Sequence, residues 1–104
     1  MTFTLEDAAR ATGGQAYNPQ GAPRSLTIVT DTRTLRPGDA FLALRGERFD
    51  GHDFVEDAVA KGASALIIEK PPTVNTVPYV VVPDTRRAYM NLAAAARATF
   101  SGRV

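Results

Sequence analysis

The side chains best suited to binding or catalysis gather in two short polar segments of this 104-residue sequence. The first, Thr30-Asp31-Thr32-Arg33, follows an apolar run and combines hydroxyl, carboxylate and guanidinium groups. The second, RGERFDGHDF (Arg45 to Phe54), holds two arginines, three acidic residues, two glycines and the only histidine. Together these segments offer hydrogen-bond donors and acceptors to a polar ligand.

The glycines of the second segment suggest an exposed backbone. Gly46 and Gly51 permit conformations that would expose amide N–H groups, and a helix is expected to begin at Asp53. Such amides form a natural site for an anion or a polar ring. Because Asp50 and Asp53 disfavour a phosphate at the helix end, a nucleobase edge or sugar hydroxyls would suit the segment better. The alternative is a solvated loop in which Asp50 folds a turn and Asp53 caps the helix.

The other side chains of the second segment have less specific interpretations. Arg45 and Arg48 could add positive charge, and Phe49 could supply an apolar face. His52 alone is more typical of a loop or a helix cap than of catalysis. No cysteine and no second histidine are present, so we expect no metal site.

Two further patterns have plain alternatives. The segment Thr30 to Arg33 is also the pattern of a turn closed by Asp31, with Arg33 on the surface. Arg86 and Arg87 fall in the first turn of a predicted helix, where the helix dipole disfavours cations. We interpret them as a surface pair offset by Asp84.

Composition and motifs exclude several classes of function. Twelve basic and eleven acidic residues give a net charge of +1, which provides no reason to expect nucleic acid or a membrane as partner. The sequence has no nucleophile elbow, phosphate-binding Walker loop, dinucleotide fingerprint or paired-carboxylate motif. We therefore predict no catalytic residue, and without a signal pattern or membrane span we expect a cytoplasmic protein.

The elements that would position these segments can be read from hydrophobic spacing and end signals. A first helix is predicted to follow a cap at Thr4, run through Ala11 or Thr12 and stop at Gly13-Gly14. Further helices are predicted at Phe54 to Lys61 and from a cap at Asp84 or Thr85 to about Phe100. Strands are predicted at Leu26 to Thr30, Ala40 to Leu44, Ser64 to Glu69 and Tyr79 to Val82. The last helix should face the core with Tyr89, Leu92, Ala93, Ala96 and Phe100. Proline-containing loops are expected around Pro19, Pro71 and Pro72.

This order of elements favours one small α/β domain. A helix between strands implies a crossover connection, so we expect a mixed β-sheet flanked by helices. Both polar segments then lie at strand ends, where such sheets usually bind ligands. The strand order is left open.

Read together, the two segments and their spacing resemble the N-terminal domain of the Mur ligases. The family pattern is D-[ST]-R, then P-G with F-x-A-L-x-G, then D-G-H-x-F, then a helix ending in G-A. The matching residues here are Asp31 to Arg33, Pro37 to Leu44, Gly46, Asp50 to Phe54 and Gly62-Ala63, and the similarity extends over roughly Leu26 to Phe100. Within the family, GERFDGHDF looks more like the enzymes that add D-alanyl-D-alanine than those that add the third peptide residue.

The resemblance implies a substrate-recognition domain for peptidoglycan biosynthesis. It would bind the UDP group of a UDP-N-acetylmuramoyl-tripeptide, to which the full enzyme joins D-alanyl-D-alanine. By match, the contacting residues are Thr30, Asp31, Thr32, Arg33, Gly46, Glu47, Arg48, Phe49, Asp50, Gly51 and His52. The alternatives are the same domain of the enzyme adding the third residue, or a free-standing uridine-nucleotide-binding or docking module.

The resemblance also implies domains that these residues do not supply. Full Mur ligases continue into a central ATPase domain that opens with a G-x-x-G-K-[ST] loop, and then into a third domain. No such loop occurs in residues 1–104. ATP and Mg²⁺ are therefore implied for the full-length enzyme, and this chain alone is expected to be non-catalytic and without a cofactor.

Overall fold

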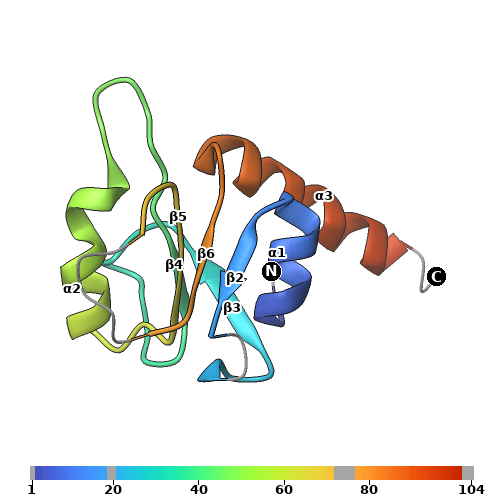
Figure 1. Cartoon of the computed structure of the whole chain (residues 1–104), viewed down its shortest axis with the longest axis horizontal. Coiled ribbons are helices and arrows are strands. Elements are labelled where there is room, and N and C mark those ends of the chain that lie inside the picture. The colour runs from blue at the N-terminus through green and yellow to red at the C-terminus, as the bar shows by residue number, and fades with distance from the viewer. Residues whose placement is uncertain (1, 19–20, 72–76, 102–104) are drawn as a thin grey trace.

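The computed structural model describes residues 2–18, 21–71 and 77–101, which form a six-stranded sheet with helices on both faces (Figure 1). The strands are β1 (Thr2–Phe3), β2 (Gln15–Tyr17), β3 (Leu26–Val29), β4 (Ala40–Leu42), β5 (Ala65–Ile68) and β6 (Tyr79–Val81). The helices are α1 (Leu5–Thr12), the 3₁₀ helix η2 (Gly51–Phe54), α2 (Val55–Ala60) and α3 (Thr85–Ser101). Pro19 and Pro72 lie outside the described residues, so the loops predicted there are seen only at their ends.

The sheet is mixed, as predicted. Its strand order is β1-β3-β4-β5-β6-β2. The four central strands β3, β4, β5 and β6 are parallel to one another, and β1 and β2 add antiparallel edges. The edge strands were not predicted, because their pairing is decided by residues that are distant in the sequence.

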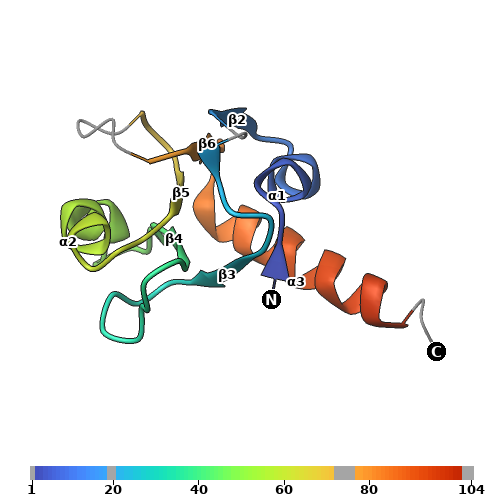
Figure 2. The same cartoon turned by 90° about the horizontal axis from the view of Figure 1, so that it is seen from below.

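Side-chain alternation along the central strands divides the core between the two faces. On β4, Leu42 points toward α1 and α3, whereas Phe41 points toward α2. All four residues of β5 are buried, which explains its continuous apolar sequence. Figure 2 shows the resulting three layers, with α2 on one side of the sheet and α1 and α3 on the other.

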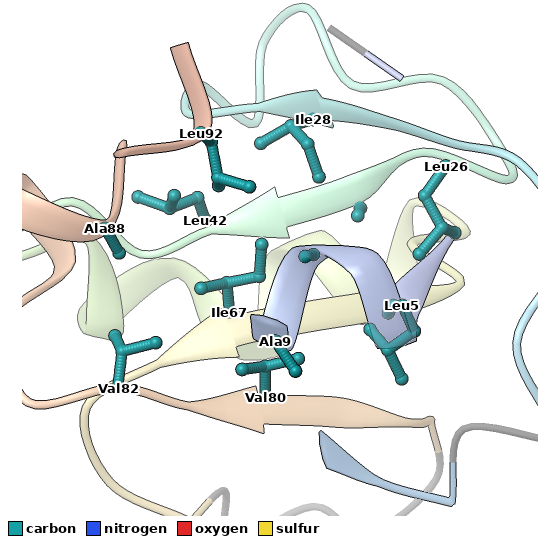
Figure 3. Close-up of a cluster of buried hydrophobic side chains, with 13 residues drawn as sticks. Leu5, Ala9, Leu26, Ile28, Leu42, Ile67, Val80, Val82, Ala88 and Leu92 are labelled. Atoms are coloured by element: carbon teal, nitrogen blue, oxygen red, sulfur yellow. The ribbon is translucent and has the colours of Figure 1, made fainter. Parts of the chain in front are cut away.

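The larger cluster joins α1 and α3 to the sheet. Leu5 from α1 and Leu92 from α3 are both buried against it (Figure 3). Removing side chains of this size from water stabilises the fold by about 1.5–3 kcal/mol each.

The predicted ends of α1 and the predicted start of α3 are confirmed. The Thr4 hydroxyl accepts the Asp7 N–H at 3.0 Å, and Gly13 ends α1 with a φ of 71°. Asp84 Oδ1 accepts the N–H groups of both Arg86 and Arg87. Both arginines are exposed, as predicted, and the contacts that Asp84 makes with them are to their backbone N–H groups.

Two predictions about helices are wrong. Asp53 does not cap a helix: Asp50 caps η2 by accepting the His52 N–H at 2.9 Å, and α2 begins later, without a side-chain cap. The capping residue is therefore Asp50, three residues before the predicted Asp53. Tyr89 is 39% exposed instead of buried, because the i, i+4 pair Ala88 and Leu92 forms the stripe facing the sheet. The side chain of Phe100 lies outside the described part of α3.

Candidate functional site

The two polar segments meet at one edge of the sheet. β3 and β4 are parallel neighbours, so the segments that follow them emerge at the same edge. A cavity of about 410 Å³ lies between them. Its lining residues are Thr30, Asp31, Thr32, Arg33, Phe41, Leu44, Phe49 and Phe54. This volume is in the range of small-ligand sites.

The polar wall of the cavity is a turn closed by Asp31. Asp31 Oδ1 accepts the Arg33 N–H at 2.9 Å, and Arg33 Nη2 lies 2.7 Å from Asp31 Oδ2. Hydrogen bonds from the Arg33 side chain, and then from its backbone, lower the pKa of Asp31 to about 2. The turn expected as the plain alternative is thus present, and it also lines the cavity.

A contact from Lys61, directly after α2, holds this turn in place. Lys61 Nζ donates to the carbonyl oxygen of Thr32 at 3.1 Å, and the Thr34 N–H donates to the carbonyl of Asp31 at 3.2 Å. Thr32 itself is buried. The polar wall therefore has a defined backbone course before any ligand binds.

Aromatic side chains form the apolar wall. The rings of Phe49 and Phe54 stack with their centroids 5.7 Å apart and their planes 20° apart. Both rings are substantially exposed, while Phe41 is buried beneath the cavity. An exposed aromatic face suits a flat ring that carries its own polar edge.

The loop that carries Phe49 rises above the sheet (green in Figure 1) and is closed by its own backbone. The Gly46 N–H donates to the carbonyl of Phe49 at 2.6 Å, and the Gly51 N–H donates to the carbonyl of Leu44 at 2.8 Å. Arg45 and Asp50 pair across its base. The expectation that Gly46 and Gly51 present free amides to a ligand is therefore wrong.

His52 lies beside the cavity and is bound within the protein. Its Nδ1 is 2.6 Å from Asp50 Oδ1, and its Nε2 accepts the Glu69 N–H at 2.8 Å. A backbone N–H can only donate, so Nε2 is unprotonated and Nδ1 carries the proton. The His52 N–H and then its side chain lower the pKa of Asp50.

A second polar group extends from Glu69, at the end of β5. Its Oε2 accepts the N–H and hydroxyl of Thr85 at 2.9 and 3.1 Å, and its Oε1 lies 2.7 Å from Arg45 Nε. The Thr85 hydroxyl in turn accepts the Arg45 N–H at 3.2 Å. Burial acts to raise the pKa of Glu69, but these hydrogen bonds outweigh it and the pKa is lowered.

The cavity therefore brings together some of the predicted site residues and not others. Thr30 to Arg33 and Phe49 line it, whereas Gly46, Glu47, Arg48, Asp50, Gly51 and His52 lie outside its lining. Phe41, Leu44 and Phe54 also line the cavity, and Glu69 and Thr85 support the loop. None of these five was predicted as a site residue. A charged residue directly after an apolar strand was the available signal for Glu69.

The arrangement is suited to binding a small polar ligand. Hydroxyls, a carboxylate and a guanidinium face an aromatic wall, which is the pattern of a recognition site. Within residues 2–18, 21–71 and 77–101, no three His, Cys, Asp or Glu side chains are grouped to hold a metal ion. Nor does any helix in those ranges have the length and apolar character to cross a membrane.

Comparison with known proteins gives consistent results. The family model described as "Mur ligase family, catalytic domain" matches residues 27–100. The UDP-N-acetylmuramoyl-tripeptide–D-alanyl-D-alanine ligase of Escherichia coli is 48% identical over 82% of this chain and 19% of its own length. The UDP-N-acetylmuramoyl-L-alanyl-D-glutamate–2,6-diaminopimelate ligase of Geobacillus thermodenitrificans is also 48% identical, over 70% of this chain and 15% of its own.

A solved structure agrees with the fold as well. Crystal structure I of MurF from Acinetobacter baumannii superposes with a TM-score of 0.85 at 39% identity, over 95% of this chain and 22% of that protein. The chain thus spans about a fifth of the length of the relatives that it matches. On the match over residues 27–100 and this agreement in fold, the chain belongs to the Mur ligase family.

Proposed function

We propose that this chain is the substrate-recognition domain of a peptidoglycan-precursor ligase and that it binds the UDP group of a UDP-N-acetylmuramoyl-peptide. The observation that carries the proposal is the cavity that Thr30 to Arg33 share with Phe49. Support also comes from the names of both types of relative, which specify UDP-N-acetylmuramoyl substrates. A uridine ring has flat faces and a polar edge, and the cavity has an aromatic wall opposite a polar one.

The proposed contacts follow the chemistry of the two walls. The uracil ring would lie against Phe49 and Phe54, since stacking requires an aromatic face. Asp31 and the threonine hydroxyls would bind the ring edge or the ribose hydroxyls. Arg33 offers guanidinium N–H groups to a phosphate oxygen, although it is already paired with Asp31.

The exposed part of the loop would complete the phosphate contacts. Gly46, Glu47 and Arg48 directly precede Phe49 in it. Arg48 is the residue of the three that can neutralise a diphosphate. Asp50, Gly51 and His52 would then act by holding the loop in shape, since their hydrogen bonds are made within the protein.

Of the two enzyme types, we propose MurF, which adds D-alanyl-D-alanine to the tripeptide. The sequence GERFDGHDF (Gly46 to Phe54) supports MurF, as does the similarity to the MurF of A. baumannii over 95% of the chain. The enzyme that adds diaminopimelate remains the second candidate, because a relative of that type is equally identical over a shorter stretch.

The chemistry of the full enzyme would reside in other domains of a longer polypeptide. There ATP and Mg²⁺ would activate the peptide carboxylate as an acyl phosphate, which the amine of D-alanyl-D-alanine would attack. This chain would hold the nucleotide far from the reaction, so that remote binding energy positions the reacting group. We propose that it forms no peptide bond alone, and that the full enzyme works in the cytoplasm, where ATP is available.

Steady-state kinetics of the full-length ligase tests the proposed binding role. Arg33→Ala should raise the KM for the UDP-linked substrate about tenfold, the effect of losing one charged hydrogen bond, and leave the KM for ATP unchanged. Arg10→Ala is a matched control, since Arg10 also pairs with a nearby aspartate, Asp7, but on α1. An unchanged KM for the UDP-linked substrate in Arg33→Ala would reject the assignment.

Substrate choice separates the two enzyme types. With ATP, the full-length enzyme should release phosphate when given UDP-N-acetylmuramoyl-tripeptide and D-alanyl-D-alanine. It should not do so with UDP-N-acetylmuramoyl-L-alanyl-D-glutamate and diaminopimelate or lysine. The reverse result would identify the enzyme that adds the third residue and leave the proposed UDP site intact.

A further inference from the structure

Glu69, which directly follows β5, holds the loop that carries Phe49 at both of its ends. At one end, the Arg45 side chain lies 2.7 Å from Glu69 Oε1. At the other end, His52 Nε2 accepts the backbone N–H of the same Glu69. Glu69 therefore binds Arg45, at the start of the loop, through its carboxylate. It binds His52, just after the loop, through its backbone N–H.

Glu69 is itself fixed from a third direction. Its carboxylate is only 12% exposed and accepts both the N–H and the hydroxyl of Thr85, at the start of α3. Thr85 is fully buried. The support is thus built from the ends of β4, β5 and α3, and the rigid part of the fold sets the position of the loop.

His52 connects Glu69 to Asp50, at the base of the loop, when its proton is on Nδ1. Its Nδ1–H donates to the side chain of Asp50, and the backbone of Asp50 forms an antiparallel β-bridge with that of Arg45 across the base. Between these two lie four residues, the last of which is Phe49, stacked on Phe54 in the cavity wall. Any shift of His52 or Glu69 therefore moves the ring that the cavity offers to a ligand.

We infer that His52 and Glu69 are positioning residues, which place Phe49 in the cavity wall without contacting the ligand. The expected effect on ligand binding rests on the proposed binding of a uridine nucleotide. The positioning role, which concerns the ring of Phe49 and the proton of His52, does not depend on any ligand.

The test uses the 104-residue chain and UDP as the probe, with His52→Ala and His52→Gln compared by NMR and calorimetry. In the unaltered chain, the imidazole ¹⁵N shifts should report the Nδ1–H tautomer, and the rings of Phe49 and Phe54 should show mutual NOEs. His52→Ala should lose those NOEs and bind UDP about tenfold more weakly. His52→Gln should recover part of both, because its amide oxygen can accept the Glu69 N–H.

Two results would overturn the inference. If His52→Ala keeps both the NOEs and the UDP affinity, His52 positions nothing. If it keeps the NOEs but loses affinity, His52 contacts the ligand directly. If His52→Ala does not fold, the Phe49–Phe54 NOEs and the UDP affinity are measured instead in Glu69→Gln, with the exposed Glu6→Gln as control. If the unaltered chain does not bind UDP, the proposed function fails, while the NOEs and the tautomer still decide the positioning role.

Discussion

Single residues that line the cavity also hold the backbone of their turn in place. Asp31 closes a turn on the Arg33 backbone and also faces the cavity. A sequence pattern that predicts a turn is therefore compatible with a binding site at the same residues. For this reason the spacing of Thr30 to Arg33 alone could not decide between the two interpretations.

The Asp31–Arg33 pair predicts a specific titration. The pKa of Asp31 is lowered from 3.8 to about 2, so the pair stabilises the folded chain above pH 3.8. That contribution is lost as the pH falls through the lowered value near 2. Carboxyl ¹³C NMR should give the low pKa in the unaltered chain and a value returning toward 3.8 in Arg33→Ala. Arg10→Ala should leave the Asp31 titration unchanged, and an ordinary Asp31 pKa in the unaltered chain would contradict the pairing.

Phe49 predicts the largest single effect on ligand affinity. Removing an aromatic ring that stacks on a base costs about 1–3 kcal/mol of binding free energy. Phe49→Ala should therefore weaken UDP binding by that amount in calorimetry of the 104-residue chain. Tyr89→Ala is the control, because Tyr89 is a similarly exposed aromatic residue on α3. Equal affinities of the two variants would exclude Phe49 from the site.

At the scale of elements, the connection from β4 to η2 depends on a close backbone approach. A Cβ at Gly51 would lie 2.7 Å from Leu44 N and 2.9 Å from Leu44 O. Gly51→Ala should therefore lower the free energy of unfolding by about 1–3 kcal/mol in a urea titration, because the backbone must shift. Gly46 lies in the same loop, and a Cβ there would come no closer than 3.8 Å, to Phe49 O. Gly46→Ala should change stability little, and equal losses in both variants would contradict this account.

The junction of β5 with α3 depends on one buried hydroxyl. Thr85→Val keeps the shape of the side chain but leaves the Arg45 N–H without its acceptor and removes a donor to Glu69. The expected loss of unfolding free energy is about 1–3 kcal/mol. Thr27→Val, at an exposed position of β3, is the matched control and should be neutral or slightly stabilising. A neutral Thr85→Val would show that the buried hydroxyl adds nothing to stability.

Local signals predicted the elements that they control. The caps at Thr4, Gly13 and Asp84, and the buried run of β5, were all evident from the sequence. The strands β1 and β2 were missed because their pairing is decided by distant partners. The cap was assigned to the wrong residue, because Asp50 and not Asp53 accepts a backbone N–H, that of His52, and begins η2.

For the whole molecule, the parallel order of β3 and β4 is the fact from which the site follows. It brings two segments separated in the sequence to one edge, where the cavity forms. The crossover rule placed both segments at strand ends, and the resemblance implied that they bind one nucleotide. That β3 and β4 are neighbours was not predicted, nor which side chains would line the cavity. Phe41, Leu44 and Phe54 join the wall only through packing.

The central claim is that this cavity binds a uridine nucleotide, and titration of the ¹⁵N-labelled 104-residue chain with UDP tests it most directly. We predict saturable amide shifts at Thr30 to Arg33, Phe49 and Phe54, with the far ends of α1 and α3 unaffected. A second hollow of about 370 Å³, bordered by Gly13 to Gln15, Glu69 and Val81 to Pro83, serves as an internal comparison. Shifts centred on that hollow, or no shifts at millimolar UDP, would contradict the account.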